Sequence, residues 1–426
     1  MTSPQRIDSV DADRSITFFF PYHDVSGVPV LFLTMARFLA DELGKKVTVV
    51  DYADGYIARN LRPTDHIEVI PFKHGAPCVL AGNTLVVMQS ILPSRAYPEL
   101  SIDPGVPVLY WHLFPANLFH VVVPILGLRQ LPLSRPRVYR LLMKWFHSEL
   151  HRGIIEFVRT LNERRGIVYY DRSTIDVTRD VLGIEIADPV LVPVPIEVPP
   201  TPMKQTAPMP QVLRVAWIGR LADFKMEILL HTIRRFSRMA AQSRITVEYQ
   251  VIGDGSEAGR LDKLSVDHPH FALRRMGVVA GEELKNHLLD QADLVTAMGQ
   301  SALESARFGV PTILLDFTFS PIRRLYRFRW LYETIDGDLA HLITDADLEA
   351  SDTLPAMIDA LFADYASYVV SAHDYCRAKH DIATVGRAFH AAAAATRMTM
   401  AHVPDVVAHR GIARRVYDRL KYGWQS

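Results

Sequence analysis

The fold class is decided by the stretch from Ile16 to Asp51, which reads ITFFFPYHDVSGVPVLFLTMARFLADELGKKVTVVD. It opens with a short apolar run, and after a turn at residues 23–27 the apolar residues recur at helical spacing up to Gly44. Val47 to Val50 is a second apolar run. Two continuous apolar strands separated by a helix are typical of a parallel sheet that is covered on both faces.

The same alternation of strand and helix patterns continues along the chain. Further strands are predicted at residues 67–70, 84–88, 106–111, 167–170, 190–194, 213–218, 245–252, 271–276, 294–297 and 312–315. Helices are predicted at residues 225–240, 282–291, 301–308, 354–366 and 388–398. The pattern predicts an α/β chain with doubly wound, parallel sheets.

A proline-rich segment divides the chain. Seven prolines stand between residues 193 and 210, where they remove backbone donors and make the segment extended and stiff. We predict an interdomain linker at 193–211, which joins Rossmann-like domains at 1–192 and 212–385. A cleft between the carboxyl ends of the two sheets would then hold the ligands. Residues 386–426 are predicted as a C-terminal helical segment that can pack back on the first domain.

Composition narrows the function classes. The chain has 47 Lys and Arg residues and 47 Asp and Glu residues, so its formal net charge is zero. This balance gives no indication of nucleic-acid binding. Cys78 and Cys376 are the two cysteines, too few for a disulfide framework or a cysteine zinc site. The N-terminus carries charges where a signal peptide needs an apolar core, and we expect no transmembrane helix. These features predict a cytoplasmic protein.

Five motifs follow one another in the second half. They are Trp217-Ile-Gly-Arg-Leu-Ala-Asp-Phe-Lys225, Val251-Ile-Gly-Asp-Gly255, Met276-Gly-Val-Val279, Gln291-Ala-Asp-Leu-Val295 and Ala302-Leu-Glu-Ser-Ala-Arg-Phe-Gly-Val-Pro311. In this order and approximate spacing they resemble the family-4 glycosyltransferases of the GT-B fold. Residues 1–192 match that family mostly by architecture.

The resemblance implies a function as well as a fold. It implies transfer of a sugar from a nucleotide-sugar donor to a hydroxyl acceptor, with retention of configuration and with no metal or other cofactor. It also implies work on a glycan or glycolipid acceptor in cell-surface polysaccharide assembly, by a cytoplasmic protein that can contact the inner face of the membrane. The partners expected are therefore the donor and the acceptor, without nucleic acid.

Arg220 and Lys225 are the candidate cations for the donor. They stand five residues apart, at the end of a predicted strand and the start of a predicted helix, so both can point toward the same edge of the sheet. Loss of the sugar leaves growing negative charge on the donor diphosphate, which fixed cations stabilise. The resemblance assigns both residues to that diphosphate.

Glu304 is the candidate catalytic carboxylate. By similarity it is the second glutamate of the family's Glu-x7-Glu motif, placed to accept hydrogen bonds from the donor ribose, and a helix-terminal glutamate is the alternative. Thr296 stands where the first glutamate is expected, and the loop after Asp293 is about six residues shorter than the family's. The resemblance also places further donor-binding residues at Gly253, Val278, Gly299 and Ser301.

The first half offers two candidates. His112 ends an apolar strand, and some relatives use a histidine there beside the acceptor or the donor phosphate, so it is the second catalytic candidate. Gly27 follows the first strand and could bring backbone amides close to a phosphate. A structural histidine and a simple turn glycine remain the alternatives.

Two further signals have simpler explanations. Asp-x-Asp triplets at 11–13, 336–338 and 345–347 match a metal-binding pattern, but such triplets arise by chance among 47 acidic residues, and we predict no metal site. Basic and aromatic residues cluster at 135–145, 323–330 and 410–424. Such helices can lie on anionic membranes, although solvated faces with aromatic core anchors are the commoner explanation.

Two other functions stay open. An enzyme of the UDP-N-acetylglucosamine 2-epimerase type shares the fold but needs further acid and base residues. A catalytically inactive sugar-nucleotide-binding partner is compatible with the missing glutamate.

Overall fold

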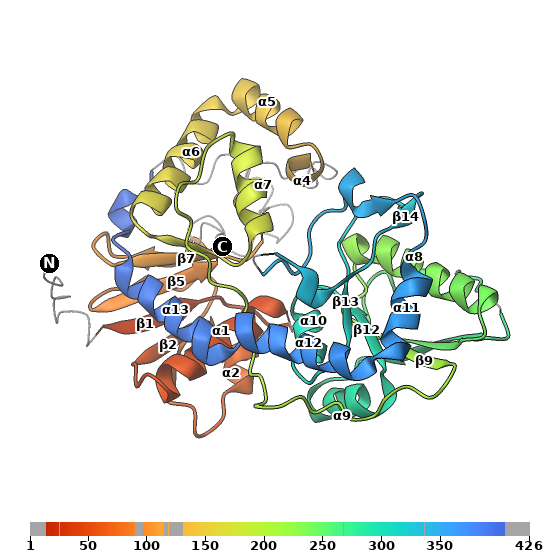
Figure 1. The fold of residues 1–426 in the computed structure, drawn as a ribbon. Helices are drawn as coiled ribbons and strands as arrows, with labels where there is room; N and C mark the ends of the chain where they lie inside the picture. Colours follow the sequence, from red (N-terminus) through yellow and green to blue (C-terminus); the bar gives the residue numbers. More distant parts are fainter. Residues whose placement is uncertain are drawn as a thin grey trace, which may run out of the picture. The chain divides into compact units, whose positions relative to one another are not determined.

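The computed structural model describes residues 14–24, 26–89, 97–114, 118, 131–266, 268–335 and 337–404. The chain divides into two compact units (Figure 1). Unit 1 comprises Met1–Pro195 and Ile382–Ser426, and unit 2 comprises Ile196–Asp381.

The main sheet of unit 1 has the strand order β3-β2-β1-β5-β7-β8, and each neighbouring pair is parallel. Its strands are β1 (Ser15–Phe19), β2 (Val47–Tyr52), β3 (Ile67–Phe72), β5 (Thr84–Gln89), β7 (Val108–His112) and β8 (Ile167–Tyr169). Counted along the chain this order is 3-2-1-4-5-6, the order of the Rossmann fold. A separate parallel pair is formed by β4 (Cys78–Leu80) and β6 (Leu100–Ile102).

Helices cover both faces of this sheet. They are α1 (Gly27–Asp41), α2 (Tyr56–Asn60), α4 (Leu131–Ser134), α5 (Pro136–Phe146), α6 (Ser148–Glu163), α7 (Arg172–Leu182) and α13 (Ile382–Ala395). The apolar residues of α1 and α13 share one core, and those of α5, α6 and α7 share another. Gly386 of α13 lies so close to Phe38 of α1 that an added Cβ atom would be 2.3 Å from its ring. The C-terminal helix is therefore an integral part of unit 1.

The main sheet of unit 2 repeats the topology, with the order β11-β10-β9-β12-β13-β15. Its strands are β9 (Val212–Ile218), β10 (Thr246–Ile252), β11 (Phe271–Gly277), β12 (Leu294–Ala297), β13 (Thr312–Leu314) and β15 (Arg329–Trp330). All neighbours are parallel except β15, which is antiparallel to β13. The pairing β14 (Leu325–Tyr326) with β16 (Leu348–Glu349) is antiparallel.

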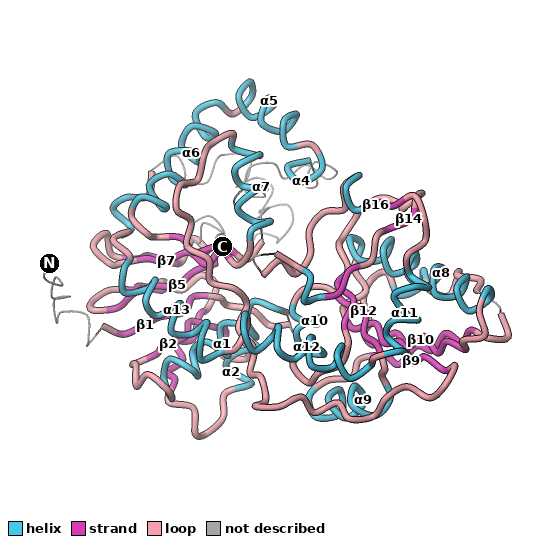
Figure 2. Tube along the Cα trace, viewed as in Figure 1, coloured by secondary structure: helices cyan, strands magenta, loops and turns pink. Residues whose placement is uncertain are grey.

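The helices of unit 2 are α8 (Asp223–Gln242), α9 (Gly281–Gln291), α10 (Gln300–Ala306), α11 (Leu354–Ala363) and α12 (Tyr365–Lys379). Short 3-10 turns lie at Ala258–Arg260, Leu331–Glu333 and Asp345–Asp347, and another at Met400–His402 belongs to unit 1. Figure 2 shows the magenta strands of each unit with cyan helices around them. The sequence prediction of doubly wound parallel sheets is confirmed.

Two predicted elements are wrong. Residues 190–194 form no strand, because the flanking prolines lack the N–H groups that a ladder needs, and a single bridge joins Leu191 to Tyr169. The helix predicted at 354–366 is two helices. They are separated at Asp364, whose carboxylate accepts a hydrogen bond from the N–H of Ser367 and caps α12.

The proline-rich segment packs on unit 2 from residue 196 onward. The backbone N–H groups of Met203 and Lys204 both donate to the carbonyl oxygen of Phe308, at 2.9 Å. The Nζ atom of Lys204 donates to the carbonyl oxygen of Leu289 at 2.6 Å. These bonds fix the segment against α9 and α10.

The described helices include no segment that is long and apolar enough to cross a membrane.

Candidate functional site

The carboxyl ends of β9, β10 and β12 meet at the middle of the sheet of unit 2. Ile218, the last residue of β9, is paired with Ala297 of β12 on one side and with Ile252 of β10 on the other. The strand order reverses between β9 and β12, and open α/β sheets bind ligands beyond the strand ends at this switch point. The loops that begin at Gly219, Gly253 and Met298 therefore surround the expected site.

Glycines lock two of these loops together. The N–H of Leu221 donates to the carbonyl oxygen of Asp254 at 2.9 Å. A Cβ atom on Gly253 would lie 2.1 Å from the carbonyl oxygen of Gly219, and one on Gly255 would lie 2.3 Å from that of Leu221. Both positions also have positive φ, 138° and 157°. Only glycine fits there, so the backbone on both sides of Arg220 is held in place.

Lys225 lies in the first turn of α8 and points back to the strand end. Its Nζ atom is 3.3 Å from the position that a Cβ atom would take on Gly219. Burial, and secondly the charge of Arg220, lower the pKa of Lys225 to about 8. Within the described residues the Nζ atom of Lys225 has no hydrogen-bond acceptor and no ion-pair partner; it lies 5.7 Å from the centroid of the Phe224 ring in a cation–π contact. Lys225 is half-buried, and a partly desolvated ammonium group without a counter-charge disfavours the ligand-free state.

Trp217 adds a second donor at the same place. Its side chain is fully buried, and its Nε1–H has no acceptor among the residues that the structure describes. Nε1 lies 3.8 Å from the Cβ position of Gly219, on which Lys225 also converges. Buried N–H groups are nearly always paired in folded proteins, so this group points to an oxygen of a ligand. The sequence analysis did not single out Trp217, although the N–H of a tryptophan in a buried strand needs an acceptor.

Arg220 completes the cationic edge. Its side chain is exposed, directly after β9, while its backbone is fixed by the interlocked loops. The structure thus brings together Arg220, Lys225 and Gly253 from the sequence prediction, and adds Trp217. Together these side chains provide three hydrogen-bond donors and two positive charges at a strand end lined by glycines. Such an arrangement can bind a phosphate group.

Gly299 and Glu304 lie on the β12 side of the switch point. Gly299 has φ of 63° and is the N-cap of α10, and its N–H donates to the carbonyl oxygen of Leu339 at 2.7 Å. Glu304 lies in the second turn of α10, and its carboxylate accepts a hydrogen bond from Arg307. Burial raises the pKa of Glu304, and the charge of Arg307 opposes that shift.

Thr296, which occupies the place of the missing glutamate, is fully buried, and its hydroxyl lies 2.7 Å from that of Tyr249. It faces the core and not a ligand. Ser301 is the second residue of α10, and its carbonyl oxygen accepts a hydrogen bond from Ser305. Val278 follows β11, two strands away from β9, and 76% of it is exposed.

His112 is placed in unit 1, where it is fully buried at the end of β7. Its Nε2 atom lies 3.2 Å from Thr178 Oγ1, and that hydroxyl donates to the carbonyl oxygen of Thr174. Nε2 therefore carries the proton and donates to Thr178. Burial lowers the pKa of His112 to about 3, so the imidazole stays neutral at physiological pH. Gly27, the first residue of α1, is exposed.

A charged network lies beyond β13. Arg329 donates to both carboxylate oxygens of Asp316, and His341 bonds Asp338 and Asp347 through its two nitrogens, at 2.8 Å and 3.0 Å. Burial alone would lower the pKa of His341, but these hydrogen bonds and the charge of Asp316 raise it to about 10. Asp316, Asp338 and His341 offer atoms within 4.8 Å that could hold a metal ion. Because Arg329 and protonated His341 already neutralise these carboxylates, the cluster fits a structural ion-pair network better than a metal site.

The Asp-x-Asp triplets are placed as follows. Residues 11–13 and Asp336 lie outside the described residues. In the third triplet, Asp345 lies 3.6 Å from Arg324 at the surface, whereas Asp347 is buried in the network.

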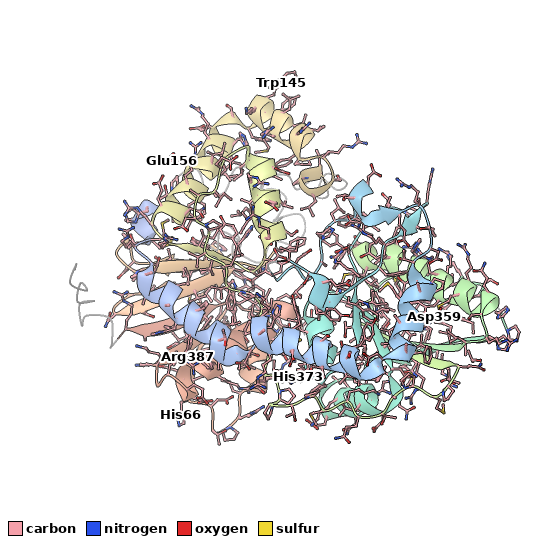
Figure 3. All side chains as sticks on the ribbon, in the orientation of Figure 1. His66, Trp145, Glu156, Asp359, His373 and Arg387 are labelled. Carbon is pink, nitrogen blue, oxygen red and sulfur yellow. The ribbon has the colours of Figure 1, made fainter. Side chains whose placement is uncertain are left out.

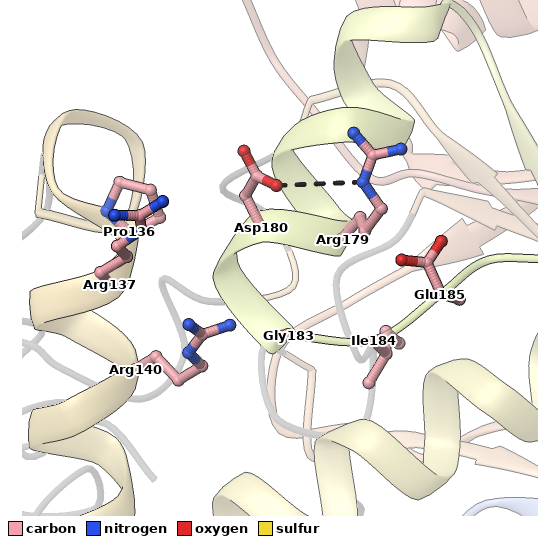
Figure 4. Close-up of a pocket in the computed structure, with 8 residues that line it drawn as sticks. All are labelled: Pro136, Arg137, Arg140, Arg179, Asp180, Gly183, Ile184 and Glu185. Atoms are coloured by element: carbon pink, nitrogen blue, oxygen red, sulfur yellow. Dashed lines mark ion pairs between the residues drawn. The ribbon is translucent and has the colours of Figure 1, made fainter.

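A cavity of about 310 Å³ lies in unit 1, and Figure 4 shows the residues that line it. It is lined by Pro136, Arg137, Arg140, Arg179, Asp180, Gly183, Ile184 and Glu185. Asp171 caps α7 just after β8, so the far end of α7, which borders the cavity, lies toward the amino ends of the strands. Two acidic residues, Asp180 and Glu185, partly balance the charge of its three arginines. The cavity does not lie at the carboxyl ends of the strands, where open α/β sheets bind their ligands.

Comparison with known proteins supports the fold. No protein-family model matches the sequence, and no curated protein matches it. A glycosyltransferase from Rickettsia africae ESF-5 is similar in structure, with a TM-score of 0.55, 11% identity, and coverage of 89% of this chain and 98% of that chain. WaaG, a glycosyltransferase involved in lipopolysaccharide biosynthesis, has a TM-score of 0.51 and 13% identity, over 90% of this chain and 100% of that one.

The N-terminal domain of Candida albicans trehalose-6-phosphate phosphatase is also similar, with a TM-score of 0.51 and 12% identity, over 93% of this chain and 99% of that one. These likenesses span most of each chain, and both units have the strand order 3-2-1-4-5-6. The chain therefore has the GT-B fold, built from two Rossmann-like domains.

Proposed function

We propose that the protein is a glycosyltransferase, which moves a sugar from a nucleotide-sugar donor to a hydroxyl acceptor. One observation carries the proposal: the ammonium group of Lys225 and the buried indole N–H of Trp217 converge beside Gly219, at the switch point of unit 2, and neither has an acceptor among the described residues. A half-buried ammonium group and a buried indole N–H at one place match the oxygens of a diphosphate.

The chemistry follows from the charges. As the bond to the sugar breaks, negative charge grows on the leaving diphosphate, and preorganised cations stabilise it most where water is excluded. Lys225 supplies a desolvated charge, and the exposed guanidinium of Arg220 can bind two oxygens at once. With these groups in place the proposed reaction needs no metal ion or other cofactor.

Around this centre we propose that Glu304 binds the donor ribose and that Gly253, Gly299 and Ser301 bring backbone groups to the donor. Val278 and Gly27 remain proposed donor contacts on sequence resemblance alone. His112 remains a proposed site residue on sequence resemblance; it is fully buried at the end of β7, and its Nδ1 atom has no partner among the described residues.

The finer proposal is a retaining enzyme of the family-4 type. Its support is the order of five motifs between residues 217 and 311. The proposed acceptor is a glycan or glycolipid of the cell surface, reached from the cytoplasm. The likeness to WaaG, which works in lipopolysaccharide biosynthesis, favours this setting.

The test is nucleotide binding by unit 2 in the full chain. Thermal shift and calorimetry with UDP, GDP, ADP, CDP and dTDP should reveal one preferred base. Arg220→Ala and Lys225→Ala should each weaken its binding about tenfold or more, because charge-assisted hydrogen bonds are worth about 1.5 to 3 kcal/mol. Arg238→Ala is the matched control, since Arg238 is an exposed arginine on the same helix α8.

Absence of binding to every diphosphate, or equal affinity of all four proteins, would overturn the proposal. Transfer activity should survive EDTA. Complete loss on chelation, with recovery on addition of magnesium or manganese, would contradict the metal-free reaction.

The buried Thr296 favours one second candidate, a nucleotide-sugar-binding partner without activity, because no carboxylate occupies the first glutamate position. Release of nucleotide diphosphate from the preferred donor separates the two functions. If release occurs without an acceptor and yields an altered sugar, an epimerase-type reaction replaces transfer.

A further inference from the structure

One side of helix α10 carries a row of polar side chains. Among residues 301–308, Ser301, Glu304 and Arg307 are partly exposed, and the other five residues are buried. Positions three residues apart are neighbours on the surface of a helix, so these side chains follow one another along the same side. The proposed ribose carboxylate of Glu304 therefore has Arg307 beside it.

The guanidinium group of Arg307 joins two parts of unit 2. Its Nη2 atom donates to Oε1 of Glu304, and its Nη1 atom donates to the carbonyl oxygen of Glu197 at 3.0 Å. Its Cζ atom lies 4.3 Å from the centroid of the Phe308 ring. Two hydrogen bonds and a cation–π contact hold the rigid fork of an arginine in one orientation. Arg307 therefore sets the position of the Glu304 carboxylate.

Arg307 also favours the charged form of this carboxylate. The side chains of Glu304 and Arg307 are 30% and 20% exposed. Burial raises the pKa of Glu304, the charge and the hydrogen bond of Arg307 lower it, and the charge of Glu197 raises it. Burial also raises the pKa of the nearby Cys376 thiol on α12, so this group adds no charge. The ion pair with Arg307 is thus what opposes neutralisation of Glu304.

The ion pair leaves part of the carboxylate free for a ligand. Arg307 bonds Oε1 of Glu304, and within the part of the chain that the structure describes no group bonds Oε2. Each oxygen of an ionised carboxylate can accept hydrogen bonds, so Oε2 can accept one from a hydroxyl while Oε1 stays on Arg307. Hydrogen bonds to a charged acceptor are roughly twice as strong as those between neutral groups. A ribose hydroxyl is therefore bound best while Arg307 keeps Glu304 charged.

The proline-rich segment has other anchors on α12. Figure 3 labels His373 on this helix, and its Nε2 atom lies 2.8 Å from the carbonyl oxygen of Pro199. Arg377, one turn later, donates to the carbonyl oxygen of Pro200 at 2.9 Å. These bonds hold the segment without Arg307. The contact with the ribose carboxylate is what distinguishes Arg307 from them.

We propose that Arg307 is a positioning residue, which holds Glu304 charged and oriented so that its carboxylate binds a hydroxyl of the donor ribose. In this role Arg307 acts through Glu304 and not on the donor itself. Its bond to Glu197 also ties the ribose carboxylate to the segment where the chain enters unit 2. The inference rests on the proposed function and deepens it, because it names the ion pair that selects ribonucleotides over 2′-deoxyribonucleotides.

Calorimetry with the full chain provides the test. The probes are ADP, CDP, GDP and UDP, each with its 2′-deoxy form. For the base that binds best, the unmodified protein should bind the ribose form about tenfold or more tightly, because the 2′-deoxy form lacks a hydrogen bond to a charged group. In Arg307→Met this ratio should fall below about threefold at neutral pH, because burial then favours the neutral carboxyl group. The loss should come from the ribose form.

Two further measurements separate positioning from a general loss of structure. Arg307→Lys keeps a positive charge beside Glu304, so its ribose preference should stay within about threefold of that of the unmodified protein. In Arg307→Met the preference should return as the pH rises and the carboxyl group ionises without its arginine. Titration of Lys225 affects both nucleotide forms alike and cancels in the ratio. Glu304→Gln cannot ionise and should show no recovery.

Two control variants leave Glu304 and its partner intact. Arg377→Met removes another arginine bond to the proline-rich segment. Lys285→Met breaks an i,i+3 ion pair on α9, where the Nζ atom of Lys285 lies 2.9 Å from Glu282. Both should keep the ribose preference. Urea denaturation checks folding, and if Arg307→Met does not fold, Arg307→Gln removes the charge in its place and should show the same loss and recovery.

The outcomes distinguish this inference from the proposed function. Tight nucleotide binding with an unchanged ribose preference in Arg307→Met would reject the role of Arg307 and leave the proposed function standing. Binding without ribose preference in the unmodified protein, or a preference for dTDP over every ribonucleotide, would do the same. Absence of binding to every nucleoside diphosphate would reject both.

Discussion

The Nζ atom of Lys225 lies 3.3 Å from the position that a Cβ atom would take on Gly219. This relationship means that the absence of one side chain creates the space in which the ammonium group sits. Gly219 also has φ of 152°, which side chains rarely adopt. The glycine of the motif therefore shapes the cationic edge through both sterics and backbone conformation.

Gly219→Ala should accordingly impair binding. The new methyl group presses on the ammonium group and strains the backbone, so nucleotide affinity should fall about tenfold and the free energy of unfolding by about 1 to 2 kcal/mol. Calorimetry and urea denaturation measure the two effects. Gly259→Ala is the control, because a Cβ atom there meets nothing within 4 Å. An unchanged affinity would separate Gly219 from the site.

Nucleotide affinity should depend on pH through Lys225. Its pKa is about 8 in the free protein, and a bound phosphate favours the charged form and raises that pKa. Binding is then strongest below pH 8 and weakens as the pH rises through that value, by about tenfold between pH 7 and pH 9. Lys225→Arg should give a flat profile over this range. The same slope in both proteins would exclude Lys225 as its source.

Replacement of Lys225 by Met should stabilise the ligand-free protein. The lowered pKa shows that the folded state disfavours the charged form, and this cost is fully present below pH 8. Near pH 7 the melting temperature of Lys225→Met should rise, with a gain of about 1 to 3 kcal/mol, while nucleotide binding is lost. Arg220→Ala should leave stability unchanged because Arg220 is exposed. A destabilised Lys225→Met variant would refute the unpaired state of the ammonium group.

The Glu304→Gln variant tests whether Glu304 binds the ribose of the donor. Gln keeps the size of the side chain but is a weaker acceptor and adds two donors, so donor affinity should fall by about 1 to 3 kcal/mol. A 2′-deoxy nucleotide should lose less from the substitution than the ribose form, and this non-additivity is measured by calorimetry. Equal losses would leave Glu304 as a partner of Arg307 alone.

The His341 network should make stability depend on pH. The pKa of His341 is raised from 6.5 to about 10, so its contribution is complete below about pH 6.5 and is lost as the pH rises toward 10. The pKa of Asp347 is lowered from 3.8, so its contribution is present above about pH 4 and is lost in more acidic solution. The network should therefore stabilise most between these limits.

His341→Gln should cost about 2 kcal/mol or more near pH 6 and less near pH 10, as measured by urea denaturation. A cost that stays constant over this range would show that His341 is not protonated in the folded protein. His268→Gln, outside the network, is the control.

The sheets could be predicted from the sequence because their strands are continuous apolar runs. Thr84 to Gln89 of β5 and Leu294 to Ala297 of β12 are buried at every position, and such runs are distinctive of parallel sheets. The segment at residues 190–194 is also apolar but forms no strand, because its prolines cannot donate the backbone hydrogen bonds that join neighbouring strands. Spacing along the chain also indicated that Arg220 and Lys225 share one strand end.

Side-chain direction could not be predicted in the same way. The Nε1–H of Trp217 converges with Lys225 only through the path of the loops around Gly219. In α5 both Tyr139 with Met143 and Val138 with Leu141 have helical apolar spacing, and periodicity does not tell which pair faces the core. Tertiary packing makes that choice.

Unit 1 is assembled from two stretches of chain, and the second arrives last during translation. Phe389 of α13 lies with its ring centroid 4.8 Å from that of Trp111 and 6.0 Å from that of Phe18, so a late helix fills an early core. Unit 2 is one continuous stretch that holds its own core. On the ribosome the second unit can therefore finish folding before the first, and nascent chains that have not reached α13 expose aromatic surface to chaperones.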